Sequence, residues 1–348
     1  MAKAVTISEM AKKLGVSTAT VTKALHGQGR ISAVTVERVK NLAREMNYIP
    51  NIAARALRTN VKNAVGLLIV SDITNPWYSQ MTSLLEKELS DRGLTMLLAL
   101  GKNDPGKMPD ILENFIGNGV RGILAGPIAT KKDLELFQAA IDRNIPLIIF
   151  GNIEPLPLNF VAIEQSTGAK IAVEHLYKQG HRRIMYFGAP EKSSRRQKGT
   201  RSAGYTEFME QHGLIPEYYS FDTLEFNRKV AFLAAKKLLK EFPGEKMPTA
   251  LFCHNDDIAL GVIPALQQAG LNVPNDISVI GFDDIAESDF FLPELTTIGG
   301  LMDSISKELL NALDQLVRSE QTGLYQKFII PELILRSTTS KPRRIQQQ

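Results

Sequence analysis

Polar and aromatic side chains follow several predicted strands of this chain, at the points where the strands end. Aromatic faces stack on the apolar faces of a sugar ring, while carboxylates, amides and an arginine pair with its hydroxyl groups. Parallel α/β sheets bind ligands beyond the carboxyl ends of their strands, so these side chains are candidates for a small-molecule site. The candidates are Asn75, Trp77, Tyr78, Phe150, Asn152, Arg201, Asn255 and Asp283.

Structural alternatives apply to some of these residues. Trp77 could serve only in packing, and Asp283 could cap the segment that follows it. Asp256 is expected to cap a helix over 257–270. The basic loop Ser193–Arg201 includes Arg195; such a loop is commonly a solvated surface, but it could also bind a phosphate or carboxylate of the ligand.

Residue patterns typical of enzymes occur here in the wrong context. Residues 117–122 spell GxGxxG, but they end a predicted helix and precede a strand, the reverse of the order that dinucleotide binding needs. The five histidines have no metal-ligand spacing. Asp283 and Asp284 are adjacent at a strand end, so their side chains point apart. The sequence therefore predicts no enzyme, no catalytic residue, no metal site and no cofactor.

Residues Thr6 to His26 read as two short helices joined by a tight turn. Thr6 and Glu9 have the spacing of a capping box, and Gly15 stands where a left-handed helix end is easiest. Ser17 can cap the second helix, whose apolar residues Val21, Ala24 and Leu25 fall on one side. The other side carries small, polar or basic residues, namely Thr18, Ala19, Thr22, Lys23 and His26.

A helix of this kind fits the major groove of DNA, although an ordinary helical hairpin is the alternative. Charge favours DNA. Residues 1–62 contain eleven basic and three acidic residues, a net charge of +8, whereas the whole chain carries +4, so residues 63–348 carry −4. A basic segment confined to one end is typical of a phosphate-binding module.

The composition is that of a globular protein, with 44% hydrophobic and 22% charged residues. No apolar run approaches the roughly 20 residues that a membrane span needs, and no secretory signal is recognised, so we expect a cytoplasmic protein. The single cysteine, Cys253, lies in an apolar run and is expected to be a buried thiol.

Beyond residue 63, apolar strand-like runs alternate with helical segments, which predicts parallel sheets covered on both faces. A Pro- and Gly-rich stretch near 151–165 marks the expected break between two lobes. We expect a helical domain over 1–49, a hinge helix over 50–62 and a core over 63–348. The first lobe of the core is expected at about 63–163 plus 294–324, and the second at about 164–293 plus 325–340.

Several separated motifs resemble the LacI/GalR family of transcriptional regulators, in the same order and over nearly the full chain. They are VSTATVTKALHG, NIAARALR, VGLLIVSDITNPWYSQM, the RxxGY of Arg201–Tyr205, HNDDIALG, VPNDISVIGFDDI and PELTTI. The resemblance implies an N-terminal all-α helix-turn-helix head and a two-lobed α/β core of the periplasmic-binding-protein type, each lobe doubly wound. It also implies a homodimer that binds double-stranded, pseudo-palindromic operator DNA.

The resemblance carries roles to individual positions. Ser17–His26 becomes the recognition helix, with Lys23 where many members have arginine, and Leu57 matches the hinge leucine that wedges into the minor groove. The positions matching Arg201, Asn255 and Asp283 contact ligand in the family, and Phe226 could add a stacking ring. The predicted DNA-binding residues are Thr6, Ser17, Thr18, Ala19, Thr20, Thr22, Lys23, His26, Arg30, Asn51, Arg55, Leu57 and Arg58.

We therefore expect a repressor of a carbohydrate-utilisation operon, controlled by a sugar bound between the lobes. Many sugar-binding relatives have an acidic residue where this chain has Gly151, and the basic loop near Arg195 leaves a sugar phosphate open. The alternatives are a purine or another metabolite as effector, and a sugar-processing enzyme with an appended helical domain. A solute-binding protein would instead show a signal peptide and no basic head.

The lone leucine of the basic hinge segment gives a testable expectation. The substitution Leu57→Ala should weaken operator binding, because a wedge that kinks the DNA brings more protein surface into contact with it. Effector affinity should stay nearly unchanged. Titrations of operator and of effector measure both, and equal operator titrations for variant and parent would reject the wedge role.

Overall fold

The computed structural model describes residues 5–26, 31–48, 63–102, 104–127, 135, 137–151, 157–189, 197–221, 227–320 and 322–343. The chain divides into two compact units, Met1–Val61 and Lys62–Gln348, which we call the head and the core. No helix among the described residues is both long and apolar enough to cross a membrane.

The head contains three helices, α1 (Ile7–Leu14), α2 (Thr18–His26) and α3 (Ala33–Glu45). Thr6 and Glu9 form the predicted capping box, and Gly15 ends α1 in the left-handed conformation, with φ 67°. Ser17 accepts a hydrogen bond from the Thr20 amide at 3.0 Å and so begins α2 as predicted. The buried side chains that join the helices are Met10, Ala11, Val21, Ala24 and Val39.

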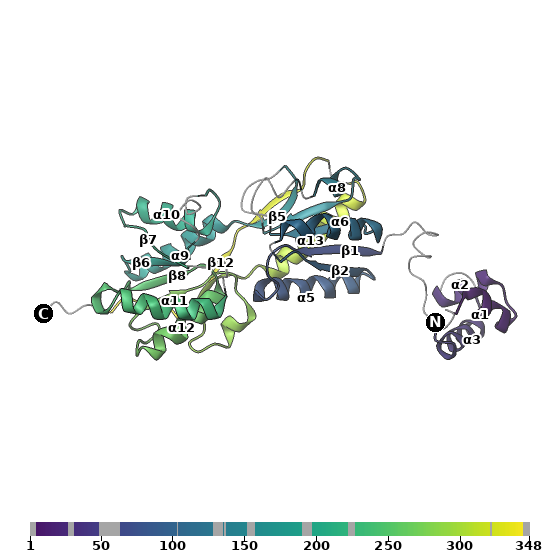
Figure 1. The fold of residues 1–348 in the computed structure, drawn as a ribbon, viewed down its shortest axis with the longest axis horizontal. Coiled ribbons are helices and arrows are strands. Elements are labelled where there is room, and N and C mark those ends of the chain that lie inside the picture. Colours follow the sequence, from purple (N-terminus) through teal and green to yellow (C-terminus); the bar gives the residue numbers. More distant parts are fainter. Residues whose placement is uncertain are drawn as a thin grey trace. The chain divides into compact units, whose positions relative to one another are not determined.

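The first lobe of the core is built on a parallel six-stranded sheet in the order β11-β5-β4-β3-β1-β2 (Figure 1). Its strands are β1 (Ala64–Ile69), β2 (Thr95–Leu100), β3 (Ile123–Gly126), β4 (Leu147–Phe150), β5 (Asn159–Ile163) and β11 (Gln326–Ile329). The helices are α5 (Pro76–Asp91), α6 (Met108–Gly117), α8 (Gln138–Ile141) and α13 (Met302–Val317), with the short 3-10 helix η1 (Pro105–Lys107) before α6.

The helices cover both faces of this sheet, as the continuous apolar strands predict. Leu67 of β1 faces the cluster that includes Leu85 of α5 and Leu309 of α13. The next residue, Leu68, faces the cluster that includes Leu112 of α6. Because successive side chains of a strand point to opposite faces, each strand contributes to both layers and the lobe is doubly wound.

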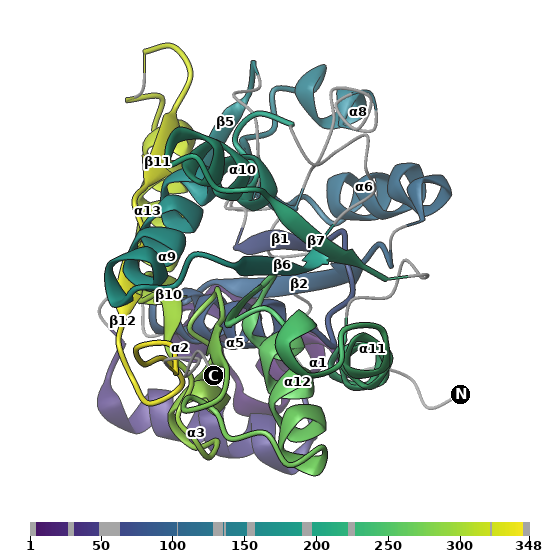
Figure 2. The ribbon, with the colours of Figure 1, turned by 90° about the vertical axis from the view of Figure 1, so that its left-hand side faces the viewer.

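The second lobe has a parallel four-stranded sheet in the order β7-β6-β8-β9. Its strands are β6 (Ile184–Ala189), β7 (Glu217–Ser220), β8 (Ala250–Cys253) and β9 (Ser278–Ile280). Two helix pairs flank this sheet in Figure 1, and Figure 2 shows the same layers from the end of the core. The pairs are α9 (Gln165–Gln179) with α10 (Arg201–Gln211), and α11 (Arg228–Glu241) with α12 (Asp256–Gln268). The 3-10 helices are η3 (Gly244–Lys246) and η4 (Ala286–Asp289).

The chain crosses between the lobes three times, between β5 and α9, between β10 (Thr297–Gly299) and α13, and between β11 and β12 (Glu332–Ile334). Strands β10 and β12 pair antiparallel, in a two-stranded sheet of their own. Repeated crossing is what the sequence predicts, since the last strands follow a helix that belongs to the first lobe.

Two expected lobe boundaries are wrong. The second lobe is expected to include residues 325–340, but β11 pairs with β5 of the first lobe, and Pro331, which has no amide hydrogen, separates β11 from β12. The first lobe is expected to include residues 294–324. The amides of Gly281 and Asp283 nevertheless donate to the carbonyls of Thr296 and Ile298, so β10 lies against the second lobe.

The glycine and tyrosine of the RxxGY motif have structural roles. A Cβ on Gly204 would lie 2.2 Å from the backbone oxygen of Ser166, so only glycine lets α10 approach the start of α9 so closely. The buried Tyr205 hydroxyl donates to the carbonyl of Ile184 at 2.8 Å and accepts from the amide of Glu217 at 2.9 Å. The motif therefore holds α10 in place, which positions Arg201 at its first residue.

The substitution Gly204→Ala should destabilise the core by about 1–3 kcal/mol, because the new methyl group meets backbone that cannot turn away. Gly117→Ala is the matched control, since a Cβ there meets nothing within 4 Å. Urea unfolding of both variants and the parent measures the difference. A stability of Gly204→Ala equal to that of the control would contradict the close-packing role.

Candidate functional site

The outer side of α2 carries the residues that the sequence assigned to DNA. Thr18, Ala19 and Lys23 are exposed and Thr22 is half-buried, whereas Val21 and Ala24 are fully buried at 0% exposure. The polar side of the helix is thus free of the head's core. It presents one positive charge beside small side chains, which permits close approach to a groove edge.

The capping hydroxyls of the head are engaged within their own helices. Thr6 accepts from the amide of Glu9, and Ser17 lies 2.9 Å from the hydroxyl of Thr20. Thr6 therefore fixes the start of α1, and Ser17 fixes the start of α2 and so the direction in which its outer face points. Among the other predicted DNA-binding positions, His26 ends α2 without a described side chain, and Arg30, Asn51, Arg55, Leu57 and Arg58 lie outside the described residues.

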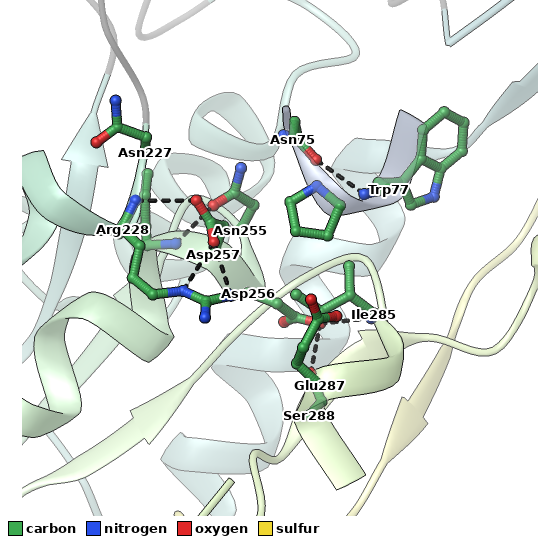
Figure 3. Close-up of polar contacts among 12 residues, drawn as sticks. Asn75, Trp77, Asn227, Arg228, Asn255, Asp256, Asp257, Ile285, Glu287 and Ser288 are labelled. Atoms are coloured by element: carbon green, nitrogen blue, oxygen red, sulfur yellow. Dashed lines mark hydrogen bonds and ion pairs between the residues drawn. The ribbon is translucent and has the colours of Figure 1, made fainter. Parts of the chain in front are cut away.

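In the first lobe, the predicted ligand residues follow β1 at the start of α5. Asn75 is the N-cap of α5, and its side-chain oxygen accepts from the amide of Trp77 at 3.0 Å (Figure 3). The Trp77 ring is 7% exposed and points away from Asn255 and Asp257 in Figure 3. It packs edge-on against Tyr78, with ring centroids 5.1 Å apart.

Phe150 is fully buried, with its ring centroid 6.4 Å from that of Trp77. These two rings therefore support Tyr78 from within the core, and the half-buried Tyr78 is the aromatic side chain best placed to meet a ligand. Three further predicted ligand residues, Asn152, Arg195 and Phe226, lie outside the described residues.

In the second lobe, Arg201 and Asp283 form one ion pair. The guanidinium of Arg201 donates to Asp283 Oδ1 at 2.8 Å and to the carbonyl oxygen of His254 at 2.6 Å. It also lies over the Phe282 ring, 3.9 Å from the centroid. The side chains of Arg201 and Asp283 are only 11% and 8% exposed, so the pair is shielded from solvent.

The two lobes meet electrostatically at these residues. Burial raises the pKa of Tyr78 to about 12, and the nearby charges of Asp283 and Arg201 act on it in opposite directions. Burial also raises the pKa of Asp283 to about 6, against the favourable effect of Arg201. Tyr78 of the first lobe is therefore within electrostatic reach of a buried ion pair of the second lobe.

The expectation that Asp256 caps α12 is wrong. Asn255 is the N-cap, and its side-chain oxygen accepts from the amide of Ile258 at 2.9 Å. Asp256 is fully buried and accepts instead from the amide of Ile285 and the hydroxyl of Ser288, both at 3.0 Å (Figure 3). These partners are 29 and 32 residues away, so no local pattern announces them.

Arg336 is a residue that the sequence analysis did not single out. It donates to Asp284 Oδ1 and to the carbonyl of Leu295, at 2.7 and 2.8 Å, and it pairs with Asp289. Asp283 and Asp284 both have positive φ, 120° and 56°, a backbone conformation that residues other than glycine rarely adopt. Arg336 and Asp256 therefore hold a strained turn from behind, and that turn presents Asp283.

A cavity of about 410 Å³ lies on the second lobe, away from the Arg201–Asp283 pair. It is mostly apolar, and its lining residues are Arg228, Lys229, Phe232, Leu260, Gly261, Pro264 and Phe291. Beside it, Phe290 and Leu292 are 84% and 81% exposed. No strand-end argument points to this groove. Within the described part of the chain, no group of three or more His, Cys, Asp or Glu residues is arranged to hold a metal ion.

Comparisons with known proteins agree with this architecture. Residues 6–51 match the model for bacterial regulatory proteins of the lacI family, and residues 173–339 match a periplasmic binding protein-like domain. The chain is 31% identical over 342 residues to the HTH-type transcriptional repressor CytR of Escherichia coli (strain K12), covering 97% of this chain and 96% of the relative.

Two further similarities extend over nearly the whole chain. It is 30% identical over 338 residues to the HTH-type transcriptional repressor PurR of Haemophilus influenzae (strain PittEE), covering 96% of this chain and 98% of the relative. Among solved structures, the lac repressor dimer bound to operator and the anti-inducer ONPF matches with a TM-score of 0.82 at 25% identity, covering 97% of this chain and all of that one.

The buried carboxyl of Asp256 predicts a pH dependence of stability. Burial and the neighbouring Asp283 raise its pKa from 3.8 to about 7. Between about pH 4 and pH 7 the folded chain therefore holds a proton that the unfolded chain has released, and the free energy of unfolding falls as the pH rises. Because one pKa unit corresponds to about 1.4 kcal/mol, the fall should be measurable.

The substitution Asp256→Asn removes this titrating group and should remove its share of the fall, as well as destabilising the core through lost hydrogen bonds. Urea unfolding at several pH values, compared with the exposed-site control Asp110→Asn, measures both effects. Parallel pH profiles for Asp256→Asn and the parent would show that the carboxyl does not titrate in this window.

Proposed function

Because this chain belongs to the lacI family of bacterial regulatory proteins, we propose that it is a homodimeric repressor of a carbohydrate-utilisation operon. In this proposal the head binds a pseudo-palindromic operator in the cytoplasm. A sugar or sugar phosphate bound between the lobes changes the affinity of the head for that operator. The observation that carries the proposal is the buried Arg201–Asp283 ion pair of the second lobe, which lies close enough to Tyr78 of the first lobe for its charges to act on the pKa of that side chain.

The exposed side of α2 supports DNA binding. Thr18, Ala19 and Lys23 form an exposed face with two small side chains, which can enter a major groove. The basic residues of 1–62 attract the phosphates of the DNA backbone. Lys23 can donate to guanine, but it lacks the planar fork of arginine. The operator sequence of a relative with arginine at this position therefore does not transfer to this chain.

The groups at the lobe junction support a hydroxylated effector. The ion pair offers two charged hydrogen-bonding partners, and Tyr78 offers both a ring face and a hydroxyl. Gly151 follows β4 with φ 68° and offers no side-chain acceptor at this position. In this proposal, the carboxylate of Asp283 is the main acceptor for the hydroxyl groups of the effector.

The apolar groove between α11 and α12 supports self-association. Its lining and the neighbouring Phe290 and Leu292 form an exposed apolar patch, which is uncommon on a monomer. We assign this patch to the second copy of the chain. Two copies related by a two-fold axis present the same patch to each other, as two heads on a palindrome require.

The proposed mechanism is a shift between two arrangements of the lobes. An effector that contacts Tyr78 and Asp283 together binds better when the lobes are close, so it favours that arrangement. The hinge expected over 50–62 would transmit the change to the heads. By linkage, the factor by which the effector changes operator affinity equals the factor by which operator changes effector affinity.

The substitution Asp283→Ala should abolish the response to effector while operator binding stays within about twofold of the parent, since Asp283 lies in the core and not in the head. Operator DNA is obtained by selection from a randomised palindrome library. Fluorescence anisotropy is then measured with and without a panel of sugars, sugar phosphates and purines.

The exposed Asp110 of α6 provides the control, Asp110→Ala, which should respond as the parent does. Thermal melting verifies that each variant is folded. A normal sugar response from Asp283→Ala would contradict the proposed effector site, and a purine that alone releases the parent would replace the carbohydrate as effector.

A further inference from the structure

Two side-chain hydrogen bonds of Gln80 join the lobes directly. Gln80 lies on α5 of the first lobe, two residues after Tyr78. Its amide nitrogen donates to Glu287 Oε2 at 3.1 Å, and its amide oxygen accepts from the backbone amide of Ala286 at 3.3 Å. Both partners belong to η4, which packs with the second lobe.

The partners of Gln80 are fixed to the second lobe on both sides. At the start of η4, the amide of Ile285 donates to the buried carboxylate of Asp256, and so does the hydroxyl of Ser288 (Figure 3). At its end, Asp289 pairs with Arg336. Because η4 is held by these contacts, it moves with the second lobe, and the bonds to Gln80 depend on the position of the whole lobe.

The other side of the contact is equally fixed to the first lobe. Trp77, Met81 and Leu85 are buried on the inner side of α5, so this helix moves with its sheet. Gln80 is half-buried, and its amide is both donor and acceptor in one contact. A carboxylate, a lysine or an alkyl side chain at this position would lose at least one of the two bonds.

We propose that Gln80 and Glu287 form a latch that stabilises the lobe arrangement of this structure and so sets the sensitivity of the chain to its effector. The proposal rests on the regulatory function proposed above. It adds two positioning residues that need not touch the ligand. The latch lies next to Tyr78 and next to the turn of Asp283, so a ligand that moves either group acts on it.

The latch predicts site-specific hydrogen exchange. In Gln80→Ala, the backbone amide of Ala286 loses its acceptor and should exchange faster. The expected increase is about two- to tenfold, because this is the factor to which the net free energy of one hydrogen bond corresponds. The amide of Ile285, bonded to Asp256, should keep its rate. Mass spectrometry with fragmentation to single residues resolves the two amides in the full-length protein without DNA or effector.

The latch also predicts a change in the distance between the lobes, which a merely local loss of bonding would not cause. Spin labels at Glu113→Cys of α6 and Lys240→Cys of α11 report this distance by pulsed electron resonance, with labelled chain diluted into an excess of unlabelled chain. Both sites are exposed, and the natural Cys253 is fully buried. Gln80→Ala should give a second or broader distance population.

Two variants control the experiment. Gln138→Ala removes a glutamine of the first lobe whose amide donates to the nearby Asp142 at the end of α8, and it should change neither readout. Glu287→Gln keeps an oxygen that can accept from Gln80, so it should preserve the distance of the parent, whereas Glu287→Ala should not.

An unchanged Ala286 exchange rate in Gln80→Ala would overturn the latch, and so would a distance distribution equal to that of Gln138→Ala. Neither readout involves DNA or effector. A failure of the latch therefore leaves the proposed function standing, and a chain that does not bind DNA would still reveal the latch.

Discussion

The edge of the second lobe that faces the first lobe depends on the hydrogen bonds of the buried Asp256 carboxyl group. It belongs to the first turn of α12 and accepts hydrogen bonds from Ile285, Ser288 and Thr297. Ile285 precedes η4, Ser288 lies within it, and Thr297 begins β10, the strand that leads toward the first lobe. A buried hydrogen-bond donor left without its acceptor is costly, so loss of this carboxyl group would leave three donors unsatisfied. One side chain thus ties a helix, a turn and a lobe crossing together.

The consequences of this constraint reach the candidate effector site. The turn of Asp283 and Asp284 has positive φ at both residues and is held by Arg336 on its far side. A strained turn persists only where its surroundings over-determine it. Here the surroundings place Asp283 against Arg201 and within reach of Tyr78. A small ligand at that point contacts both lobes, which is the condition for coupling its binding to their movement.

Sequence patterns predicted the head well because its signals are local. A capping box, a helix end and apolar stripes within 20 residues determine α1 and α2, and both helices appear as expected. The continuous apolar runs of the core likewise predict parallel strands. Strand β5 is hard to recognise in the sequence because it follows the Pro- and Gly-rich stretch that marks the lobe break, and β7, with the sequence EYYS, because it is short and polar.

Long-range contacts account for the remaining differences. Pro331 lies between β11 and β12, which belong to different sheets, and only the fold reveals this division. Asp256 looked like a helix cap because its true partners lie far along the chain. Trp77 and Phe150 are aromatic residues at strand ends, yet their rings turn into the core. Residue type and position at a strand end therefore predict candidate ligand residues, but they do not separate side chains that line a site from those that pack behind it.

The central claim is that relative movement of the lobes carries the effector signal to the head. Gln80→Cys and Glu287→Cys, joined by a short bismaleimide, would fix the lobes, since the buried Cys253 stays unmodified. The decisive measurement is operator affinity of the cross-linked and uncross-linked chains, with and without the sugars that act on the parent. The account predicts that the cross-linked chain binds operator with an affinity that no sugar changes. A cross-linked chain that responds as fully as the free one would contradict it.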